Sequence, residues 1–366
     1  MNIPTTFDEI TPQWLTDTLR ASGDLPARAS VTSREVERRG EGVGFVGQIG
    51  RLQLTFAGDA AGAPASVIAK LPSPDEGARA IANLYGLYER EVRFYEHLGE
   101  DVGMRTARCY WAAGDKESGR YGLLLEDLGV SGRLGDQLGG CSEDEALLAI
   151  RELAGMHASW WSSPRLDSFD WMHLGVDLVR AAMTFAYPNA WPVAVDLFGK
   201  HMSPEVRTVV EGLAPRLMKL MDVIVADVPL TVVHGDYRLD NMFFGQNGAP
   251  YGLAVVDWQS PNRGWGAYDL AYFMGGNMPS ERRRTCEREM IGTYHQLLVD
   301  AGIRGYDADQ LWLDYRRSMM VYLGIFVVSG ATLDFSNERA VGLMAAIFGR
   351  LSDAIMELDA IKLLPE

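Results

Sequence analysis

The sequence predicts an α+β protein with two lobes: a small N-terminal lobe with an antiparallel sheet and one main helix, and a larger, mostly helical C-terminal lobe. Three observations support this fold class. The chain has 366 residues, which is long for a single compact core. Glycines and alternating apolar residues characterise the first third, whereas helical periodicity characterises most of the remainder. The change falls close to Gly129, so we expect lobes over residues 1–127 and 128–366.

In the N-terminal lobe, the clearest pattern is a strand in which Leu52, Leu54 and Phe56 alternate with polar residues. The glycines before this strand predict a turn that joins it to an earlier strand. The expected elements are a helix over 10–21, a strand–turn–strand unit over 31–56, a strand over 67–71, a helix over 76–99 and a strand over 121–125.

In the C-terminal lobe, Ser142 and Glu145 form a capping box, so a helix should run from there to about Trp161. Residues 246–249 contain Asn-Gly, which favours a tight hairpin turn. The other expected elements are short strands over 230–233, 241–244 and 251–256, and helices from about Ser280 onward, including a buried helix over 318–333.

Composition excludes several classes of protein. Lys plus Arg is 34 and Asp plus Glu is 49, so the net charge is −15, which disfavours a nucleic-acid partner and would favour cationic small molecules. The longest uncharged stretch is too short to span a membrane, and no signal peptide is visible. The three cysteines show no CxxC spacing, which predicts a reducing, cytoplasmic location without a disulfide framework or a structural zinc site.

The strongest functional signal is the segment VVHGDYRLDNMFFG, which is followed by AVVDWQ. The hairpin should bring Asn241 and Asp257 together, and their oxygens suit Mg²⁺ with phosphate oxygens. Asp236 could accept a proton from an incoming hydroxyl, and Arg238 could reach a transferring phosphoryl group. The alternative is that these residues only form turns, but that does not explain two strand-borne acceptors beside a third carboxylate and an arginine.

The second signal is the glycine pattern formed by Gly42, Gly44 and Gly47. A dinucleotide-binding unit would need a helix after these glycines, but an alternating strand follows instead. A glycine loop between antiparallel strands is typical of the flap that covers phosphates in kinases. A flexible hairpin without this function is the alternative interpretation.

The third signal is a glutamate in an apolar helix seam. Glu91 lies within the seam formed by Ile81, Leu84, Tyr88, Tyr95 and Leu98. An inward carboxylate is costly unless it is paired, and Lys70 on the short strand VIAKL is the candidate partner. The alternative is a partly exposed glutamate at the edge of the seam.

Other residues are interpreted as structural. The sequence contains no GxxxxGK[ST], HExxH or GxSxG motif. His157 lies on a strongly helical segment and is expected in the core, and Asp269 is expected to be buried and to brace the catalytic loop. Most tryptophans and tyrosines between 160 and 191 are expected in the core, although one or two could line a substrate cleft.

The motifs HGDYRLDN, VVDWQ and YDLAYF resemble those of the aminoglycoside phosphotransferase and choline kinase superfamily. The segments FDEITPQWLTDTL and EREVRFYEHL resemble its ecdysteroid-kinase-like branch and the bacterial relatives of that branch. The resemblance runs from about Phe7 to about Tyr272. It implies a protein-kinase-like bilobal fold and ATP-dependent phosphorylation of a small-molecule hydroxyl. The HxDxxxxN motif with its following Asp is highly specific, whereas the glycine loop is not.

The resemblance also implies roles for individual residues. Asp236 corresponds to the catalytic aspartate and Arg238 to a basic residue near the γ-phosphate. Asn241 and Asp257 correspond to the Mg²⁺ ligands. The other matches are the phosphate-positioning pair Lys70 and Glu91, and the hinge from Glu126 to Leu128, whose backbone would bind adenine.

Two other functions fit the same residues. One is an antibiotic kinase that acts on aminoglycosides or macrolides, which an acidic cleft within residues 160–360 would favour for aminoglycosides. The other is a nucleotide-binding protein without catalytic activity. The presence of Lys70, Glu91, Asp236, Asn241 and Asp257 weighs against that second alternative.

Overall fold

The structure is a computed structural model that describes residues 2–39, 47–246, 248–332 and 336–366. The chain divides into two compact units. The first unit contains Met1–Gly132 with the returning segments Gly245–Pro250 and Ala254–Ser260, and the remaining residues form the second unit. An antiparallel sheet dominates the first unit and helices dominate the second, which confirms the α+β fold class.

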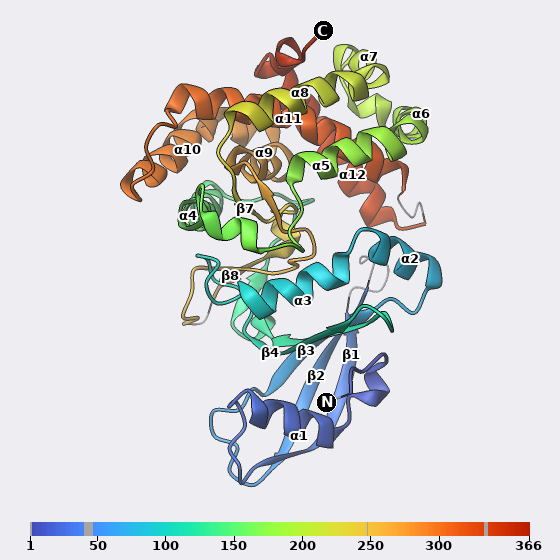
Figure 1. The fold of residues 1–366 in the computed structure, drawn as a ribbon, viewed down its shortest axis with the longest axis vertical. Helices are drawn as coiled ribbons and strands as arrows, with labels where there is room; N and C mark the ends of the chain where they lie inside the picture. The colour runs from blue at the N-terminus through green and yellow to red at the C-terminus, as the bar shows by residue number, and fades with distance from the viewer. Residues whose placement is uncertain (1, 40–46, 247, 333–335) are drawn as a thin grey trace. The chain divides into compact units, whose positions relative to one another are not determined.

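The first unit is built on a five-stranded sheet with the order β1-β2-β3-β5-β4 (Figure 1). All neighbouring strands in this sheet are antiparallel. The predicted strands are present, and the sequence interpretation missed β4. The strands are β1 (Ser30–Arg39), β2 (Gly47–Ala57), β3 (Ser66–Pro72), β4 (Cys109–Asp115) and β5 (Arg120–Glu126).

One face of this sheet is covered by α1 (Pro12–Ala21), the predicted first helix. Thr11 caps the helix by accepting a hydrogen bond from the Trp14 N–H, and Pro12 occupies the first turn, where no amide donor is needed. Leu15 and Leu19 of α1 belong to the same buried core as alternate residues of β2 and β3. Because strand side chains alternate between faces, the residues between them point to the opposite side.

The predicted helix over 76–99 is wrong in one respect, because it is two helices, α2 (Glu76–Leu84) and α3 (Leu87–His97). Gly86 between them has a φ of 63°, a left-handed conformation that cannot continue an α-helix. The break resets the helical phase. Ile81 and Leu84 are therefore 55% and 79% exposed instead of lying in the apolar seam, whereas the seam residues after the break are buried.

The predicted hairpin corresponds to β8 (Met242–Gly245) and β9 (Leu253–Val255), which are neighbours in a sheet with β6 (Gly132–Leu134). The turn is closed by a hydrogen bond of 2.9 Å from the Ala249 N–H to the Gln246 carbonyl. Gly248 has a φ of 77°, as a tight turn requires. Asn247 lies outside the described residues, and so do Gly42 and Gly44 of the glycine loop, whereas Gly47 begins β2.

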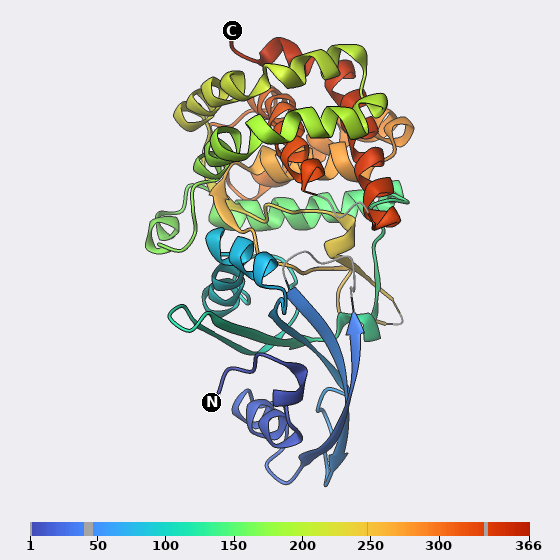
Figure 2. The same cartoon turned by 90° about the vertical axis from the view of Figure 1, so that its right-hand side faces the viewer.

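The second unit is mostly helical, and Figure 2 shows its helices from a second side. Ser142 and Glu145 form the predicted capping box at the start of α4. Among the described residues, no helix is long and apolar enough to cross a membrane. The helices are α4 (Glu143–Trp160), α5 (Gly175–Ala181), α6 (Tyr187–Phe198), α7 (Pro204–Glu211), α8 (Leu213–Asp227), α9 (Gly266–Asn277), α10 (Ser280–Asp300), α11 (Ala308–Ala331) and α12 (Glu338–Glu357). The short strands β7 (Thr231–Val233) and β10 (Asn262–Gly264) pair with each other.

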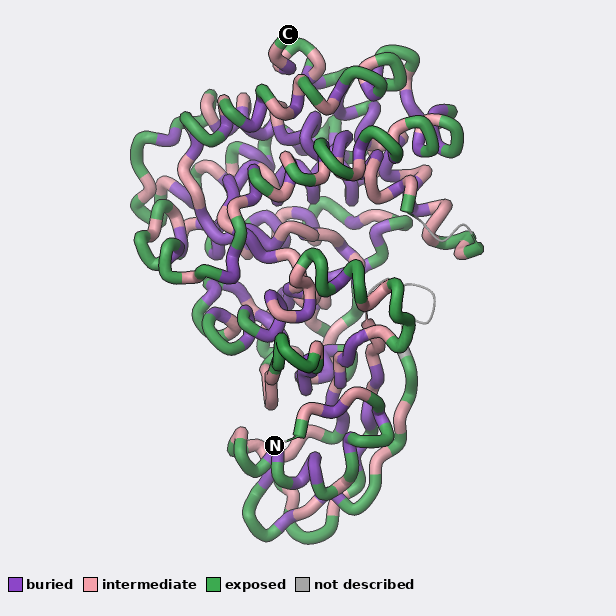
Figure 3. Tube along the Cα trace, turned by 45° about the vertical axis from the view of Figure 1, so that its right-hand side comes forward, coloured by how far each residue is buried: buried purple, intermediate pink, exposed green. Residues whose placement is uncertain are grey.

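Helix α9 is the central helix of the second unit. Every residue of α9 except Tyr268 is buried, and the helix packs against both α11 and α12. Figure 3 colours the chain by burial and shows that buried residues alternate with exposed ones along most of the helical segments. Its glycines allow this close packing, because a Cβ atom at Gly275 would lie 2.9 Å from the Met319 sulfur. A helix fixed on all sides can hold the groups that contact it, and the predicted catalytic loop is one of the segments hydrogen-bonded to α9.

Candidate functional site

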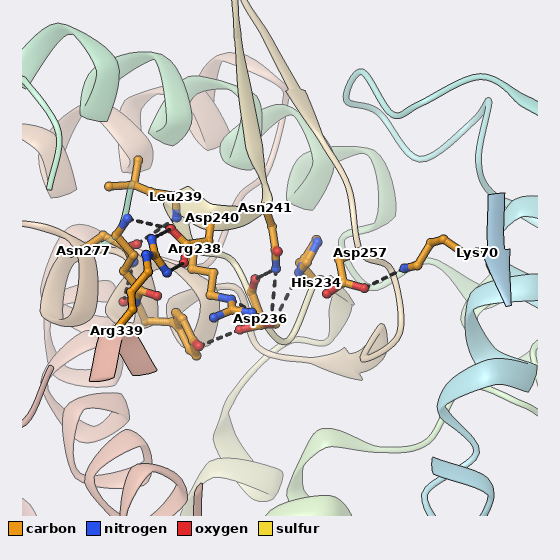
Figure 4. Close-up of polar contacts among 12 residues, drawn as sticks. Lys70, His234, Asp236, Arg238, Leu239, Asp240, Asn241, Asp257, Asn277 and Arg339 are labelled. Atoms are coloured by element: carbon orange, nitrogen blue, oxygen red, sulfur yellow. Dashed lines mark hydrogen bonds and ion pairs between the residues drawn. The ribbon is translucent and has the colours of Figure 1, made fainter. Parts of the chain in front are cut away.

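A lysine and two carboxylates meet inside the first unit. The Lys70 Nζ lies 2.5 Å from Oε1 of Glu91 and 2.8 Å from Oδ1 of Asp257 (Figure 4 draws the second contact). The ion pair between Lys70 and Glu91 was predicted from the sequence. The contact between Lys70 and Asp257 was not, because the two residues are far apart in the chain.

Strand and helix geometry place the two partners. Ala69 and Leu71 of β3 belong to the core beneath α1, so Lys70 between them points to the other face of the sheet. Glu91 comes from α3 and is only 3% exposed, which confirms the prediction of an inward carboxylate. A buried carboxylate requires a partner, and the lysine supplies one.

Burial and the charges of neighbouring groups shift the pKa values of Lys70 and Glu91 in opposite directions. Burial alone would lower the pKa of the Lys70 ammonium, but the carboxylates of Asp257 and Glu91 outweigh it and hold that pKa above its usual value. Burial raises the pKa of the Glu91 carboxyl, and Lys70 opposes this shift. The lysine therefore stays charged at neutral pH, and its positive charge is what makes the buried glutamate tolerable.

Asp257 has an unusual backbone conformation, with a φ of 67°. This left-handed region is uncommon for residues other than glycine, and such residues cluster at functional sites. The next residue, Trp258, is fully buried and stacks on Phe94 of α3 with a centroid distance of 4.0 Å. Its indole N–H also donates to the Val255 carbonyl at 3.1 Å. The chain on the C-terminal side of Asp257 is thus anchored firmly.

The predicted hinge segment is fixed by its side chains. The Glu126 carboxylate lies 2.5 Å from the Arg105 guanidinium and accepts a hydrogen bond from the Arg108 N–H at 3.0 Å. The next residue, Asp127, lies 2.5 Å from Arg51 and accepts a hydrogen bond from Ser66 at 2.6 Å. Leu128 follows and is buried. No local pattern in the sequence indicates this role of Asp127, because its partners lie on other strands.

In the second unit, three groups surround the carboxylate of Asp236 (Figure 4). Oδ1 accepts a hydrogen bond of 2.6 Å from the Tyr272 hydroxyl. Oδ2 accepts one of 3.1 Å from the Asn241 amide and lies 3.0 Å from Nε of Arg238 in an ion pair. The structure thus brings together the three residues of this loop that the sequence singled out. Tyr272 was part of the YDLAYF motif, but it was not recognised as a site residue.

Helix α9 holds the backbone of this loop at two further points. The Asp269 carboxylate accepts hydrogen bonds from the N–H groups of His234 and Gly235, at 2.6 and 3.0 Å. The Asn277 side-chain oxygen accepts a bond of 2.8 Å from the Leu239 N–H. Asp269 is fully buried, so the prediction that it is buried and braces the loop is confirmed.

Two neighbouring features are structural. His157 is fully buried, as predicted, and its Nδ1 lies 2.7 Å from the Tyr294 hydroxyl. Asp240, beside Asn241, accepts a hydrogen bond from the Gln137 N–H at 2.8 Å and forms an ion pair of 3.2 Å with Arg339 at the start of α12. The contacts of Asp240 join the loop to segments far away in the sequence.

The groups predicted to bind Mg²⁺ have suitable chemistry. The Asn241 amide nitrogen is committed to the carbonyl and the carboxylate of Asp236, which leaves the amide oxygen as the atom that could bind a cation. Asp257 supplies a hard carboxylate. Within the described ranges, no group of three or more His, Cys, Asp or Glu side chains could hold a metal ion. Mg²⁺ commonly uses only one or two protein ligands together with phosphates and water. Asn241 and Asp257 belong to different units, so their shared role stays a prediction.

Solved structures share this fold over nearly the whole chain. A putative aminoglycoside phosphotransferase from Ralstonia eutropha JMP134 has a TM-score of 0.52 and 20% identity, covering 96% of this chain and 99% of that one. Choline kinase from Cryptosporidium parvum Iowa II has a TM-score of 0.56 and 10% identity, with 95% and 97% coverage. The GDP and kanamycin complex of APH(2")-IIIa has a TM-score of 0.51 and 14% identity, with 95% and 98% coverage. The fold is therefore the bilobal, protein-kinase-like one that the sequence predicted.

The family of this chain and its kinase-like fold identify it as a small-molecule kinase, a phosphotransferase with an alcohol group as acceptor. The profile of the ecdysteroid kinase-like family matches residues 41–303, which is most of the chain, and the protein belongs to this family. A comparison with curated proteins found no match.

Proposed function

We propose that this protein transfers the γ-phosphoryl group of ATP to a hydroxyl group of a small molecule, with Asp236 as the catalytic base. One observation carries the proposal: the Asp236 carboxylate lies on a loop braced by a buried helix, and Asn241 and Arg238 contact it directly. A carboxylate held in this way can orient a hydroxyl and accept its proton late in a phosphoryl transfer.

The first unit would hold the nucleotide. Lys70, fixed by Glu91, would contact the phosphates, as in kinases where a lysine pairs with a helix glutamate. The loop with Gly42, Gly44 and Gly47 would cover them, and the backbone from Glu126 to Leu128 would bind adenine. The structural relative APH(2")-IIIa was solved with GDP, which supports a nucleotide here as well.

The second unit would hold the acceptor. Arg238 would approach the transferring phosphoryl group, where a guanidinium can stabilise the developing charge. Asn241 and Asp257 would hold Mg²⁺, which when bound would neutralise charge on the phosphate oxygens. The net charge of −15 and the reducing environment indicated by three cysteines without disulfides fit a cytoplasmic enzyme that acts on neutral or cationic alcohols.

The test begins with the wild-type protein, ATP and a panel of hydroxyl compounds that includes amino alcohols, sugars, sterols, aminoglycosides and macrolides. Transfer to an aminoglycoside or a macrolide alone would favour an antibiotic kinase. ATP binding without transfer to any compound would favour a nucleotide-binding protein that lacks catalysis. The preferred acceptor then serves in the variant measurements.

In the decisive measurement, Asp236→Asn keeps the shape of the side chain and removes its charge. ATP affinity, measured by calorimetry, should change little. The single-turnover rate of transfer should fall by on the order of 10²–10⁴, the usual contribution of a positioned base. Asp353→Asn is a control, because this aspartate lies at the surface with a side chain that is 50% exposed. A wild-type transfer rate in Asp236→Asn would show that Asp236 is not the base.

A further inference from the structure

Tyr272 is held rigidly beneath Asp236. It lies on α9, three residues after Asp269, and is only 7% exposed. Its ring contacts Tyr322 edge-on, with a centroid distance of 4.6 Å, and Phe326 at 5.4 Å, both on α11. Aromatic packing on two sides fixes the plane of the ring and therefore the direction of its hydroxyl group.

The hydroxyl of Tyr272 donates to Oδ1 of Asp236 at 2.6 Å, the length of a strong bond to a charged acceptor. Burial raises the pKa of Tyr272 well above its usual value, and the nearby charge of Asp236 raises it further. The phenol therefore keeps its proton over the whole physiological range and remains a donor. It cannot compete with Asp236 as a base.

The two oxygens of the Asp236 carboxylate are not equivalent. Oδ2 faces two nitrogen groups, from Asn241 at 3.1 Å and from Arg238 at 3.0 Å. Oδ1 faces one donor, the hydroxyl of Tyr272. Two nitrogen groups therefore crowd Oδ2, one of them as a hydrogen-bond donor and the other as an ion-pair partner. A carboxylate oxygen has two lone pairs, so Oδ1, which faces only the Tyr272 hydroxyl, retains one for a further donor.

We propose that Tyr272 is a positioning residue for the phosphoryl transfer: it locks the carboxylate of Asp236 and directs the acceptor hydroxyl to Oδ1. This inference rests on the proposed function of Asp236 as the base. It adds the identity of the accepting atom and the residue that selects it.

The transfer step is then defined atom by atom. The acceptor hydroxyl donates a hydrogen bond to the remaining lone pair of Oδ1. This bond directs the oxygen of the acceptor hydroxyl toward the γ-phosphorus of ATP. The acceptor oxygen forms a bond to phosphorus while the bond from phosphorus to the β–γ bridging oxygen breaks. The bridging oxygen keeps the electron pair and leaves with ADP, and the hydroxyl proton passes to Oδ1 of Asp236.

Tyr272→Phe removes the hydroxyl and keeps the packed ring. The kcat should fall about tenfold, the effect of losing one hydrogen bond to a charged group, and KM for ATP should stay unchanged. Losing a donor to the charged form of a carboxyl favours its protonated form. The acidic limb of the pH profile of kcat should therefore move to higher pH.

Tyr187→Phe is the matched control. Tyr187 is also buried in the second unit, and its hydroxyl donates to the carbonyl of Val210 at 2.7 Å, remote in sequence from the catalytic loop. Its loss should lower the melting temperature without moving the acidic limb of the pH profile.

A second variant changes Tyr272 more conservatively, by replacing it with a fluorinated tyrosine, which is a stronger hydrogen-bond donor of similar size. That protein should show the opposite change, with the acidic limb at lower pH.

A double variant distinguishes a failure of the inference on Tyr272 from a failure of the proposed function of Asp236. If Tyr272 acts through Asp236, then Tyr272→Phe should cause no further loss of transfer rate in an Asp236→Asn background. An equal loss in both backgrounds, with no movement of the pH profile, would mean a merely structural role and would overturn the inference. A slow Asp236→Asn variant beside a Tyr272→Phe variant with wild-type kcat and pH profile would also overturn it, and would leave the proposed function standing. Only an unimpaired Asp236→Asn variant would remove the proposed function itself.

Discussion

The two units fix their functional carboxylates by different physical means. In the first unit, the buried Glu91 and Asp257, with its left-handed φ, both form ion pairs with Lys70. In the second unit, Asp236 is held mainly by a hydroxyl and an amide, and its loop is held by acceptors on α9 that bind backbone N–H groups. The first cluster relies on charge compensation, whereas the second combines one ion pair, from Arg238, with several hydrogen bonds.

This difference has a practical meaning. A charge cluster fails as a whole when one member is removed, because the remaining buried charge has no partner. A set of hydrogen bonds to backbone groups loses one contact at a time, and each lost bond has a smaller cost. The first unit should therefore respond to charge and pH more strongly than the second.

The largest expected effect is that of Lys70→Met, which removes the cation that lies against both carboxylates. The variant should lose about 3–5 kcal/mol of stability, because it breaks a buried ion pair on one side. The measurement is denaturant unfolding of the variant against wild type, with Lys200→Met as a control at an exposed lysine. A loss no larger than that of the control would contradict the charge-compensation view.

The same variant gives a prediction on pH. Burial raises the pKa of Glu91, and removing the lysine removes the main opposing influence, so that pKa should rise further. A group with a raised pKa in the folded state contributes stability that is present at low pH and is lost as the pH rises through that value. The stability deficit of Lys70→Met should therefore be small in mildly acidic buffer and large in mildly alkaline buffer. A deficit that is constant across this range would contradict the prediction.

An intermediate effect is expected for Asp269→Asn. An amide has one acceptor oxygen where the carboxylate has two, so one of the N–H groups of His234 and Gly235 would lose its partner. The cost should be about 1–3 kcal/mol, the penalty of a buried unsatisfied donor. Hydrogen exchange of the loop amides should increase in parallel. Asp177→Asn, at a side chain that is 61% exposed, is the control, and an equal response of both variants would contradict the bracing role.

The smallest effect is expected for Arg339→Gln. Arg339 pairs with Asp240 and Asp136, but its side chain is 42% exposed, and exposed pairs contribute little. The loss of stability should be below about 1 kcal/mol, and high salt should reduce the difference between wild type and variant. A larger loss of stability that high salt does not reduce would contradict this prediction, because it would show that the pair is not screened by solvent.

Local patterns predicted much of the site. The loop with Asp236, Arg238 and Asn241 was visible because its polar residues lie close together between short strands. Glu91 was visible because a charged residue interrupts an apolar seam, and Asp269 because it lies in an apolar helix. In each case a single segment carried the information, and the structure places these residues where the segment indicated.

What the sequence did not predict depends on distant contacts or on a single backbone angle. The hydrogen bond from Tyr272 and the second partner of Lys70, Asp257, join segments whose proximity no local pattern encodes. The break at Gly86 was missed because a glycine inside a helical pattern is often tolerated, and only its left-handed φ shows that the helix ends. Ile81 and Leu84 were then assigned to the wrong side of a helix that does not continue.

The spacing of contacts along α9 limits how this protein can change in length. Asp269, Tyr272 and Asn277 reach the catalytic loop from one continuous helix. Inserting a single residue between the first and the last of them would rotate Asn277 by about 100° around the helix axis, since an α-helix has 3.6 residues per turn. Leu239 would then lose its acceptor even if every original side chain were still present. A substitution along α9 affects one contact with the loop at a time. An insertion or deletion would rotate every residue that follows it, so all contacts after that point would be lost together.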